Sequence, residues 1–198
     1  MTSENRDVFQ TLRDHINQFT SIDRRNFDKI ESYFIPLRTR KKEILFREND
    51  LCDTLYYISE GCLHLYFTDE NGLQKTVQFG IENWWITDFL AFHHGSRTEF
   101  SLQAIESSNL LSISRIQQDQ LVEKHPTMET YFRKIYEIAY GAAMLRTKYN
   151  FNFSKEEIYF RFRDQFPEFA QRIPQYLLAT FLGLTPEYLS KIRAKKRS

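Results

Sequence analysis

Glu187 and Lys191 carry the side chains best suited to chemistry near the end of the chain. They stand four residues apart, so a helix would place them on one face. A carboxylate there can accept a hydrogen bond from the amino group of cytosine, and a lysine ammonium can donate to guanine O6 and N7. This pair therefore predicts a helix that reads base edges in DNA. The residues expected to meet DNA along this helix are Thr185, Pro186, Glu187, Tyr188, Ser190 and Lys191.

The last residues of the chain are strongly basic. From Gln171 to Ser198 the sequence has six basic residues and one acidic residue, a net charge of +5, whereas the whole chain carries +1. A near-neutral protein with a basic end indicates an anionic partner for that end. Lys195, Lys196 and Arg197 follow the predicted helix, and we expect them to contact DNA phosphates without reading sequence.

The apolar residues around this helix have the spacing of a helix-turn-helix. When Gln175 is counted as position one, positions five, nine, 15 and 18 are Ala179, Gly183, Leu189 and Ile192. A small residue at position five allows the second helix to approach closely, and glycine at position nine tolerates the positive φ of the turn. Thr185 followed by Pro186 is typical of a helix start. The alternative interpretation is a helical hairpin that binds no DNA.

Upstream of this motif the sequence separates into a helical part and a strand-rich part. Residues 5–34 have apolar side chains at helical spacing, with Ser21 as the expected N-cap of a second helix. From Pro36 short alternating runs follow, as in an antiparallel sandwich or jelly roll. These runs are EILF, TLYYIS, CLHLYF, KTVQFG and FSLQAI, separated by turns at 48–50, 60–62, 69–72 and 93–96.

Residues 126–150 predict a long helix with one apolar seam. Its apolar residues recur at separations of 4, 3, 4, 3 and 4, which is the a/d seam of a two-stranded coiled coil. The seam residues are Tyr131, Ile135, Ile138, Ala142, Leu145 and Tyr149. The pattern predicts a homodimer, with Tyr136 and Tyr140 facing the sandwich; the alternative is a helix lying on its own core. Ser154 and Glu157 then predict a capping box for one more helix.

Composition excludes several classes of protein. The 18 Phe and 11 Tyr residues argue against disorder, and 41% hydrophobic residues can form a buried core. No apolar run approaches the length of a membrane span, and the N-terminus lacks a signal-peptide core, so we expect a cytoplasmic protein. Cys52 and Cys62 lack CxxC spacing and are interpreted as reduced structural residues.

A β-roll, a dimer-length helix and a C-terminal helix-turn-helix together resemble the Crp/Fnr superfamily of transcription regulators, the family of the cyclic-AMP receptor protein. The segment ILFRENDLCDTLYYISEGCLHLYFTDENG is similar to the opening cyclic-nucleotide-binding strands, with Gly61 and Gly72 at turns. The ending LGLTPEYLSKIRAKK resembles a subgroup without the β-wing. The resemblance covers nearly the whole chain and implies an α+β fold. Its expected parts are a sensor β-roll with N-terminal helices at 1–125, a dimerisation helix at 126–150 and an all-α DNA-binding domain at 151–198.

The resemblance also implies an effector site. The family's phosphate-binding cassette corresponds to ITDFLAFHHGSRTEF, with Thr87 at its Gly, Asp88 at its ribose-binding Glu, Arg97 at its phosphate-binding Arg and Thr98 at its Ser/Thr. Glu99 takes the small-residue position and adds repulsion toward phosphate. Threonine in place of glycine blocks close backbone approach. The expected pocket residues are Phe79, Thr87, Asp88, Phe89, Arg97, Thr98 and Met144.

These departures from the family's cassette argue against a cyclic nucleotide as the effector. The family's adenine-reading Thr-Ser pair should fall within 142–146, where no hydroxyl pair exists. We therefore place an unknown small molecule, or none, ahead of a cyclic nucleotide. Arg97 is the candidate partner for an anionic ligand; the alternative is a surface Arg paired with Glu99.

Other chemistry has less support in the sequence. A cupin-type metal enzyme needs paired histidines plus a carboxylate, but His64 stands alone and His93 and His94 are adjacent in a predicted turn. Iron–sulfur sensing needs a cysteine cluster that the sequence lacks, and nothing specific supports haem at His64. Trp84 and Trp85 are interpreted as a β-turn or sheet-edge pair that belongs to the core, the alternative being a pair that stacks on a ligand.

The leading hypothesis is a non-enzymatic, homodimeric transcription regulator that binds double-stranded DNA, with RNA polymerase as a further candidate partner. The first alternative is a small-molecule-binding module, for example for a cyclic nucleotide, whose helical end contacts only proteins. A cupin-like metal enzyme is the third. No metal or membrane partner is predicted.

Overall fold

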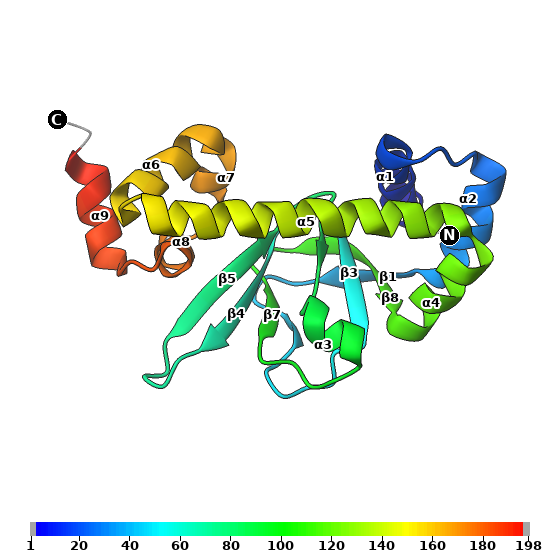
Figure 1. Ribbon diagram of the computed structural model, residues 1–198, viewed down its shortest axis with the longest axis horizontal. Helices are drawn as coiled ribbons and strands as arrows, with labels where there is room; N and C mark the ends of the chain where they lie inside the picture. Colours follow the sequence, from blue (N-terminus) through cyan, green and yellow to red (C-terminus); the bar gives the residue numbers. More distant parts are fainter. Residues whose placement is uncertain (1–2, 196–198) are drawn as a thin grey trace. The chain divides into compact units, whose positions relative to one another are not determined.

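The computed structural model describes residues 3–195 and shows two compact units of the chain, coloured along the sequence in Figure 1. The N-terminal unit contains the chain up to Leu65 together with Phe79–Glu137. The C-terminal unit contains Tyr66–Gln78 and the chain from Ile138 onward. The long helix expected at 126–150 is α5, Pro126–Asn152, and the two units share it.

The alternating runs form two antiparallel sheets, as the sequence pattern predicts. Within residues 3–195, each sheet has four strands, in the orders β1-β8-β3-β6 and β2-β7-β4-β5. The strands are β1 (Ile35–Thr39), β2 (Ile44–Phe46), β3 (Thr54–Glu60), β4 (Leu63–Thr68), β5 (Gln74–Gly80), β6 (Trp85–Ile86), β7 (Ser101–Ala104) and β8 (Ser108–Ser114). In the first sheet Leu37 lies opposite Leu110, and Leu55 lies opposite Ile113. The predicted β-roll fold is therefore confirmed.

The turn between β3 and β4 requires glycine. Gly61 has φ +111, and a Cβ on it would lie 2.1 Å from the hydroxyl oxygen of Ser108. An L side chain would meet both a strained backbone and a steric clash there. The turn position that the sequence assigns to Gly61 is thus explained by the close approach of β8.

Helices at the start of the chain cover the first sheet, and α1 lies against β3 and β8. These elements are α1 (Ser3–Phe19), α2 (Arg24–Ile30) and the 3-10 turn η1 (Glu31–Tyr33). The prediction that Ser21 caps the second helix is wrong. Asp23 directly precedes α2, and its carboxylate accepts a hydrogen bond from the backbone N–H of Asn26 at 2.7 Å. A cap must immediately precede the first helical residue, and Ser21 lies too early.

A short helix, α3 (Phe89–His94), replaces the first half of the turn predicted at 93–96. Asp88 caps its start, and Gly95 ends it with φ +60. The helix α4 (Arg115–Lys124) follows β8. Of the tryptophan pair, Trp85 is buried as predicted, whereas Trp84 is 46% exposed and does not belong to the core.

A polar network lies inside the core of the N-terminal unit. Trp85 donates its indole N–H to the Tyr131 hydroxyl at 2.8 Å, and that hydroxyl lies 2.8 Å from Nδ1 of His15. The tyrosine oxygen accepts from Trp85, and the tyrosine proton can be donated to Nδ1 of a neutral His15 that carries its own proton on Nε2. The network joins α1, β6 and α5 and is satisfied with a neutral imidazole.

This network corrects the predicted dimer seam. Tyr131 has no exposed surface in the single chain, and Ile135 packs against the same core. Tyr131 therefore faces the protein's own interior, and Ile135 is partly buried beside it. Tyr136 also faces this unit, where it accepts a hydrogen bond from Gln118 at 3.0 Å. Tyr140 was expected to face the sandwich but is 67% exposed.

The buried His15 predicts a loss of stability in mild acid. Burial lowers its pKa from 6.5 to about 4, while the contacting Tyr57 and Tyr131 have pKa values raised by burial and stay neutral. The unfolded chain binds a proton below pH 6.5 and the folded chain does not, so stability falls as pH falls. The free energy of unfolding should decrease by about 2 kcal/mol between pH 8 and pH 5 on account of His15.

Urea unfolding measured across this pH range tests that expectation. His64, whose pKa burial also lowers, adds to the wild-type slope. His15→Gln should therefore remove only part of the slope. An identical slope in wild type and His15→Gln would show that His15 is not held neutral in the fold.

The C-terminal helices gather around the end of α5 (Figure 1). They are α6 (Lys155–Gln165), α7 (Pro167–Arg172), α8 (Gln175–Leu182) and α9 (Pro186–Lys195). The predicted capping box of α6 is confirmed, because Glu157 accepts from the backbone N–H of Ser154 at 2.8 Å and the Ser154 hydroxyl accepts in return. Between residues 3 and 195 no helix combines the length and the hydropathy that a membrane span needs.

Candidate functional site

Helices α8 and α9 form the helix-turn-helix that the spacing predicts. Gly183 ends α8 with φ +68, and its N–H and that of Leu184 bond back to α8 carbonyls. The Thr185 hydroxyl accepts from the backbone N–H of Tyr188 at 3.2 Å and caps α9. Ala179, at position five, has no exposed surface, as expected where the second helix of the motif lies close to the first. The turn chemistry and the small residue therefore act as expected.

The two faces of α9 separate as the sequence predicts. Leu189 and Ile192 are each 1% exposed, so the inner face is buried. The residues of the predicted DNA-reading helix are exposed: Thr185, Pro186, Glu187, Tyr188, Ser190 and Lys191. The side chain of Lys195 and the residues Lys196 and Arg197 lie outside the described part of the chain, and their phosphate contacts stay a prediction.

Arg146 of α5 holds the C-terminal unit together, a role that the sequence did not indicate. Its guanidinium donates to the backbone carbonyl of Val77 on β5 and, at 3.1 Å, to that of Phe181 on α8. It also stacks on the Phe181 ring, 4.1 Å from the centroid. Burial lowers the pKa of this arginine. Thr180 of α8 adds a hydrogen bond to the Thr76 hydroxyl at 3.2 Å. Strand β5 is thus tied to the first helix of the helix-turn-helix.

Of the cassette residues, Asp88 and Thr98 meet and bond to each other, whereas Thr87 bonds to the backbone. One Asp88 carboxylate oxygen accepts from the N–H groups of Leu90 and Ala91 at 3.2 Å and so caps α3. The other accepts from the Thr98 hydroxyl at 2.8 Å. The Thr87 hydroxyl donates to a backbone carbonyl and lies 3.2 Å from the Cys52 sulfur. The carboxylate that would bind a ribose is therefore already engaged.

The remaining residues of the expected effector pocket do not join this hydrogen-bonded group. Arg97 is exposed and donates to the backbone carbonyl of Asn49, so the alternative ion pair with Glu99 is not formed. Phe89 contacts Tyr136 edge to face at 5.6 Å. Phe79 is buried on β5, and Met144 is 47% exposed on the part of α5 that belongs to the other unit.

The histidines do not assemble a metal centre. His64 is 1% exposed and lies 3.2 Å from the Gln103 side-chain oxygen, and burial lowers its pKa. His93 and His94 are exposed at the end of α3. Among the described residues, no group of three or more His, Cys, Asp or Glu side chains could hold a metal ion. Cys52 and Cys62 are both buried and free.

Known proteins resemble this chain in sequence over the β-roll and in structure over most of its length. Residues 36–125 match the family model of the cyclic nucleotide-binding domain. A protein described as a transcriptional regulator of the Crp/Fnr family from Eubacterium rectale has a TM-score of 0.67 at 13% identity, covering 89% of this chain and 84% of that one. The chain has the fold of the Crp/Fnr regulators.

Two further solved structures agree with this fold. The c-di-GMP responsive global regulator CLP of Xanthomonas campestris has a TM-score of 0.66 at 16% identity, covering 88% of this chain and 92% of that one. The catabolite activator protein of Thermus thermophilus has a TM-score of 0.57 at 18% identity, covering 91% and 85%. Comparison with curated proteins gives no match.

Within the Crp/Fnr fold, this chain keeps the scaffold and departs at the cassette. Thr87 is 1% exposed and its hydroxyl donates to the Thr54 carbonyl. A ligand therefore cannot approach the backbone here as closely as it could at a glycine. Where the family's adenine-reading hydroxyl pair is expected, α5 carries Arg146, which bonds to β5 and α8.

Proposed function

We propose that this protein is a homodimeric, DNA-binding transcription regulator of the Crp/Fnr type, and not an enzyme. The observation that carries the proposal is the C-terminal helix-turn-helix, whose inner residues Leu189 and Ile192 are buried while Glu187, Ser190 and Lys191 are exposed. Helix pairs of this kind place the exposed face of the second helix in the major groove. The Crp/Fnr fold around it supports the same function, and a cytoplasmic location follows from a DNA partner.

The second half of α5 supports the homodimer. Ile138 is 57% exposed and Leu145 is 52% exposed, and Ala142 between them is exposed as well. Together with Tyr149 they keep the coiled-coil spacing in the part of α5 that follows the buried Tyr131 and the partly buried Ile135. Large apolar side chains in one row on a helix surface are stabilised when a second copy covers them.

The effector is proposed to be a small molecule bound differently from cyclic AMP. The match of residues 36–125 to the cyclic nucleotide-binding domain favours a ligand in the roll. The engaged carboxylate of Asp88 and the inward-bonded Thr87 oppose the usual ribose and phosphate contacts. A ligand in this position would have to rely on Arg97 turning from the Asn49 carbonyl toward it.

Selection of binding sites from random duplex DNA, followed by titration, tests the DNA-binding function. The wild-type dimer should enrich a palindrome with half-sites about one helical turn apart. Lys191→Ala should cost about 1–3 kcal/mol and relax the preference at one base pair in each half-site.

Lys41→Ala is the matched control, because Lys41 is an exposed lysine of the N-terminal unit. It should leave both affinity and preference unchanged. Equal losses in the two variants would indicate general charge attraction, and no binding by the wild-type protein would favour the alternative of a small-molecule module with protein partners.

A further inference from the structure

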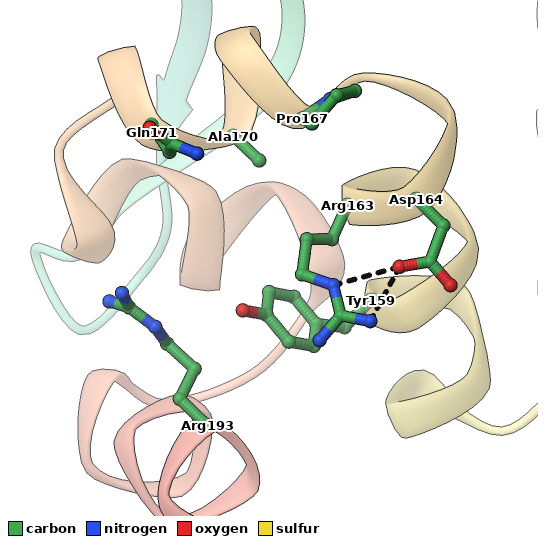
Figure 2. Close-up of a pocket in the computed structure, with 7 residues that line it drawn as sticks. All are labelled: Tyr159, Arg163, Asp164, Pro167, Ala170, Gln171 and Arg193. Atoms are coloured by element: carbon green, nitrogen blue, oxygen red, sulfur yellow. Dashed lines mark hydrogen bonds and ion pairs between the residues drawn. The ribbon is translucent and has the colours of Figure 1, made fainter. Parts of the chain in front are cut away.

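A surface pocket of about 590 Å³ lies within the C-terminal unit, between α6, α7 and α9 (Figure 2). Its polar lining consists of Tyr159, Arg163 and Asp164 from α6, Gln171 from α7 and Arg193 from α9. Pro167 and Ala170 form an apolar wall on α7. The pocket is separate from the cassette, and its residues lie outside the exposed face of α9 that is proposed to read bases.

Tyr159 brings a hydroxyl group to the pocket. The residue as a whole is 5% exposed, and its ring packs against Phe160 with a centroid distance of 5.3 Å. Figure 2 shows this hydroxyl pointing toward the side of the pocket that Arg193 occupies. A phenol hydroxyl in this position can donate a hydrogen bond to a ligand atom in the pocket.

The two arginines supply positive charge on either side of the tyrosine ring. Within the described chain, the Arg193 guanidinium forms no ion pair or hydrogen bond. Arg163 donates from Nε to an oxygen of the adjacent Asp164 at 2.8 Å and from one terminal nitrogen to the same oxygen at 2.5 Å. Its other terminal nitrogen remains available. The pocket therefore offers donors from two guanidinium groups and a phenol, with Asp164 as its only charged acceptor.

We propose that this pocket binds a phosphate group. Guanidinium groups bind phosphate oxygens through charge-assisted hydrogen bonds, and donors on two helices suit a tetrahedral anion. The volume exceeds that of phosphate alone and is within the range of small-molecule sites, so the apolar wall can contact the group that bears the phosphate. That group is either a phosphorylated small molecule or the DNA backbone, and the second source rests on the proposed function.

Titration of the full-length protein with inorganic phosphate, followed by ³¹P relaxation in chloride buffer, tests the site. Arg193→Gln should weaken phosphate binding at least about tenfold, because it removes a charged donor. Tyr159→Phe should weaken it by a smaller factor without disturbing the ring. Arg161→Gln, an exposed arginine of α6 that does not line the pocket, should have no effect.

The salt dependence of DNA binding distinguishes the two sources. If a backbone phosphate occupies the pocket, Arg193→Gln should flatten the slope of log K against log salt by about one unit per chain, and Arg161→Gln should not. An unchanged slope with weakened phosphate binding identifies a phosphorylated small molecule. Equal behaviour of wild type and Arg193→Gln in both measurements overturns the proposal. Should the wild type bind no DNA, the proposed function fails, and the phosphate titration alone still decides the pocket.

Discussion

Replacing Ile138 by glutamate is expected to convert the dimer into a folded monomer. Ile138 is 57% exposed in the single chain, so the glutamate stays solvated when the chain is alone and the fold should persist. In the dimer the same carboxylate would be buried against its twin without a cation. An unpaired buried charge costs about 3–5 kcal/mol, enough to weaken association more than a hundredfold. Light scattering over a concentration series measures the change.

Ala143→Glu is the control for this experiment. Ala143 lies one residue beyond the seam position Ala142, and its side chain is exposed on another face of α5. The same added charge there should leave the dimer intact. A dimer that survives Ile138→Glu at low concentration would contradict the seam and place the interface elsewhere.

Replacing Arg146 by methionine should destabilise the C-terminal unit and loosen the attachment of β5 to α8. The change leaves the carbonyls of Val77 and Phe181 without their donor and removes the contact with the Phe181 ring. Each partly buried carbonyl left without a donor costs about 1–3 kcal/mol, so a loss of about 3 kcal/mol is expected. Hydrogen exchange should accelerate in Tyr66–Gln78 and at the end of α8, and denaturant unfolding gives the free energy.

Two further arginine variants make this result specific. Arg146→Lys keeps the charge but cannot reach both carbonyls with a planar fork, so an intermediate loss is expected. Arg133→Met removes an exposed arginine of the same helix, whose ion pair with Glu137 contributes about 0.5 kcal/mol at most. Equal stability of Arg146→Met and Arg133→Met would show that the guanidinium does not hold the unit together.

The sequence by itself determined those features that depend on neighbouring residues. The turn of the helix-turn-helix needs a residue with positive φ and a cap, and Gly183 and Thr185 supply both within three positions. The capping box of α6 is equally local, because Ser154 and Glu157 satisfy each other's backbone groups. The alternating strands were recognisable because each buries one face, which produces a period of two.

Only the tertiary structure decided which groups meet across long separations. The heptad spacing of α5 is the same from Tyr131 to Tyr149, but α1 and β6 bury Tyr131 and leave Ile138 exposed. Nothing in the local pattern distinguishes a seam residue from a core residue, because both are apolar at the same helical period. Tertiary contacts likewise turned Asp88 into a helix cap bonded to Thr98.

The same reason explains the residues that the sequence did not reveal. Arg146 bonds to a carbonyl 69 residues earlier and another 35 residues later, and Tyr159 and Arg193 line one pocket only because α6, α7 and α9 come together there. Such contacts depend on how helices pack, whereas capping and turns depend on backbone hydrogen bonds within a few residues. The sequence thus determined the strands and the two helices of the C-terminal motif, and packing decided the core, the exposed part of the seam and the pocket between α6, α7 and α9.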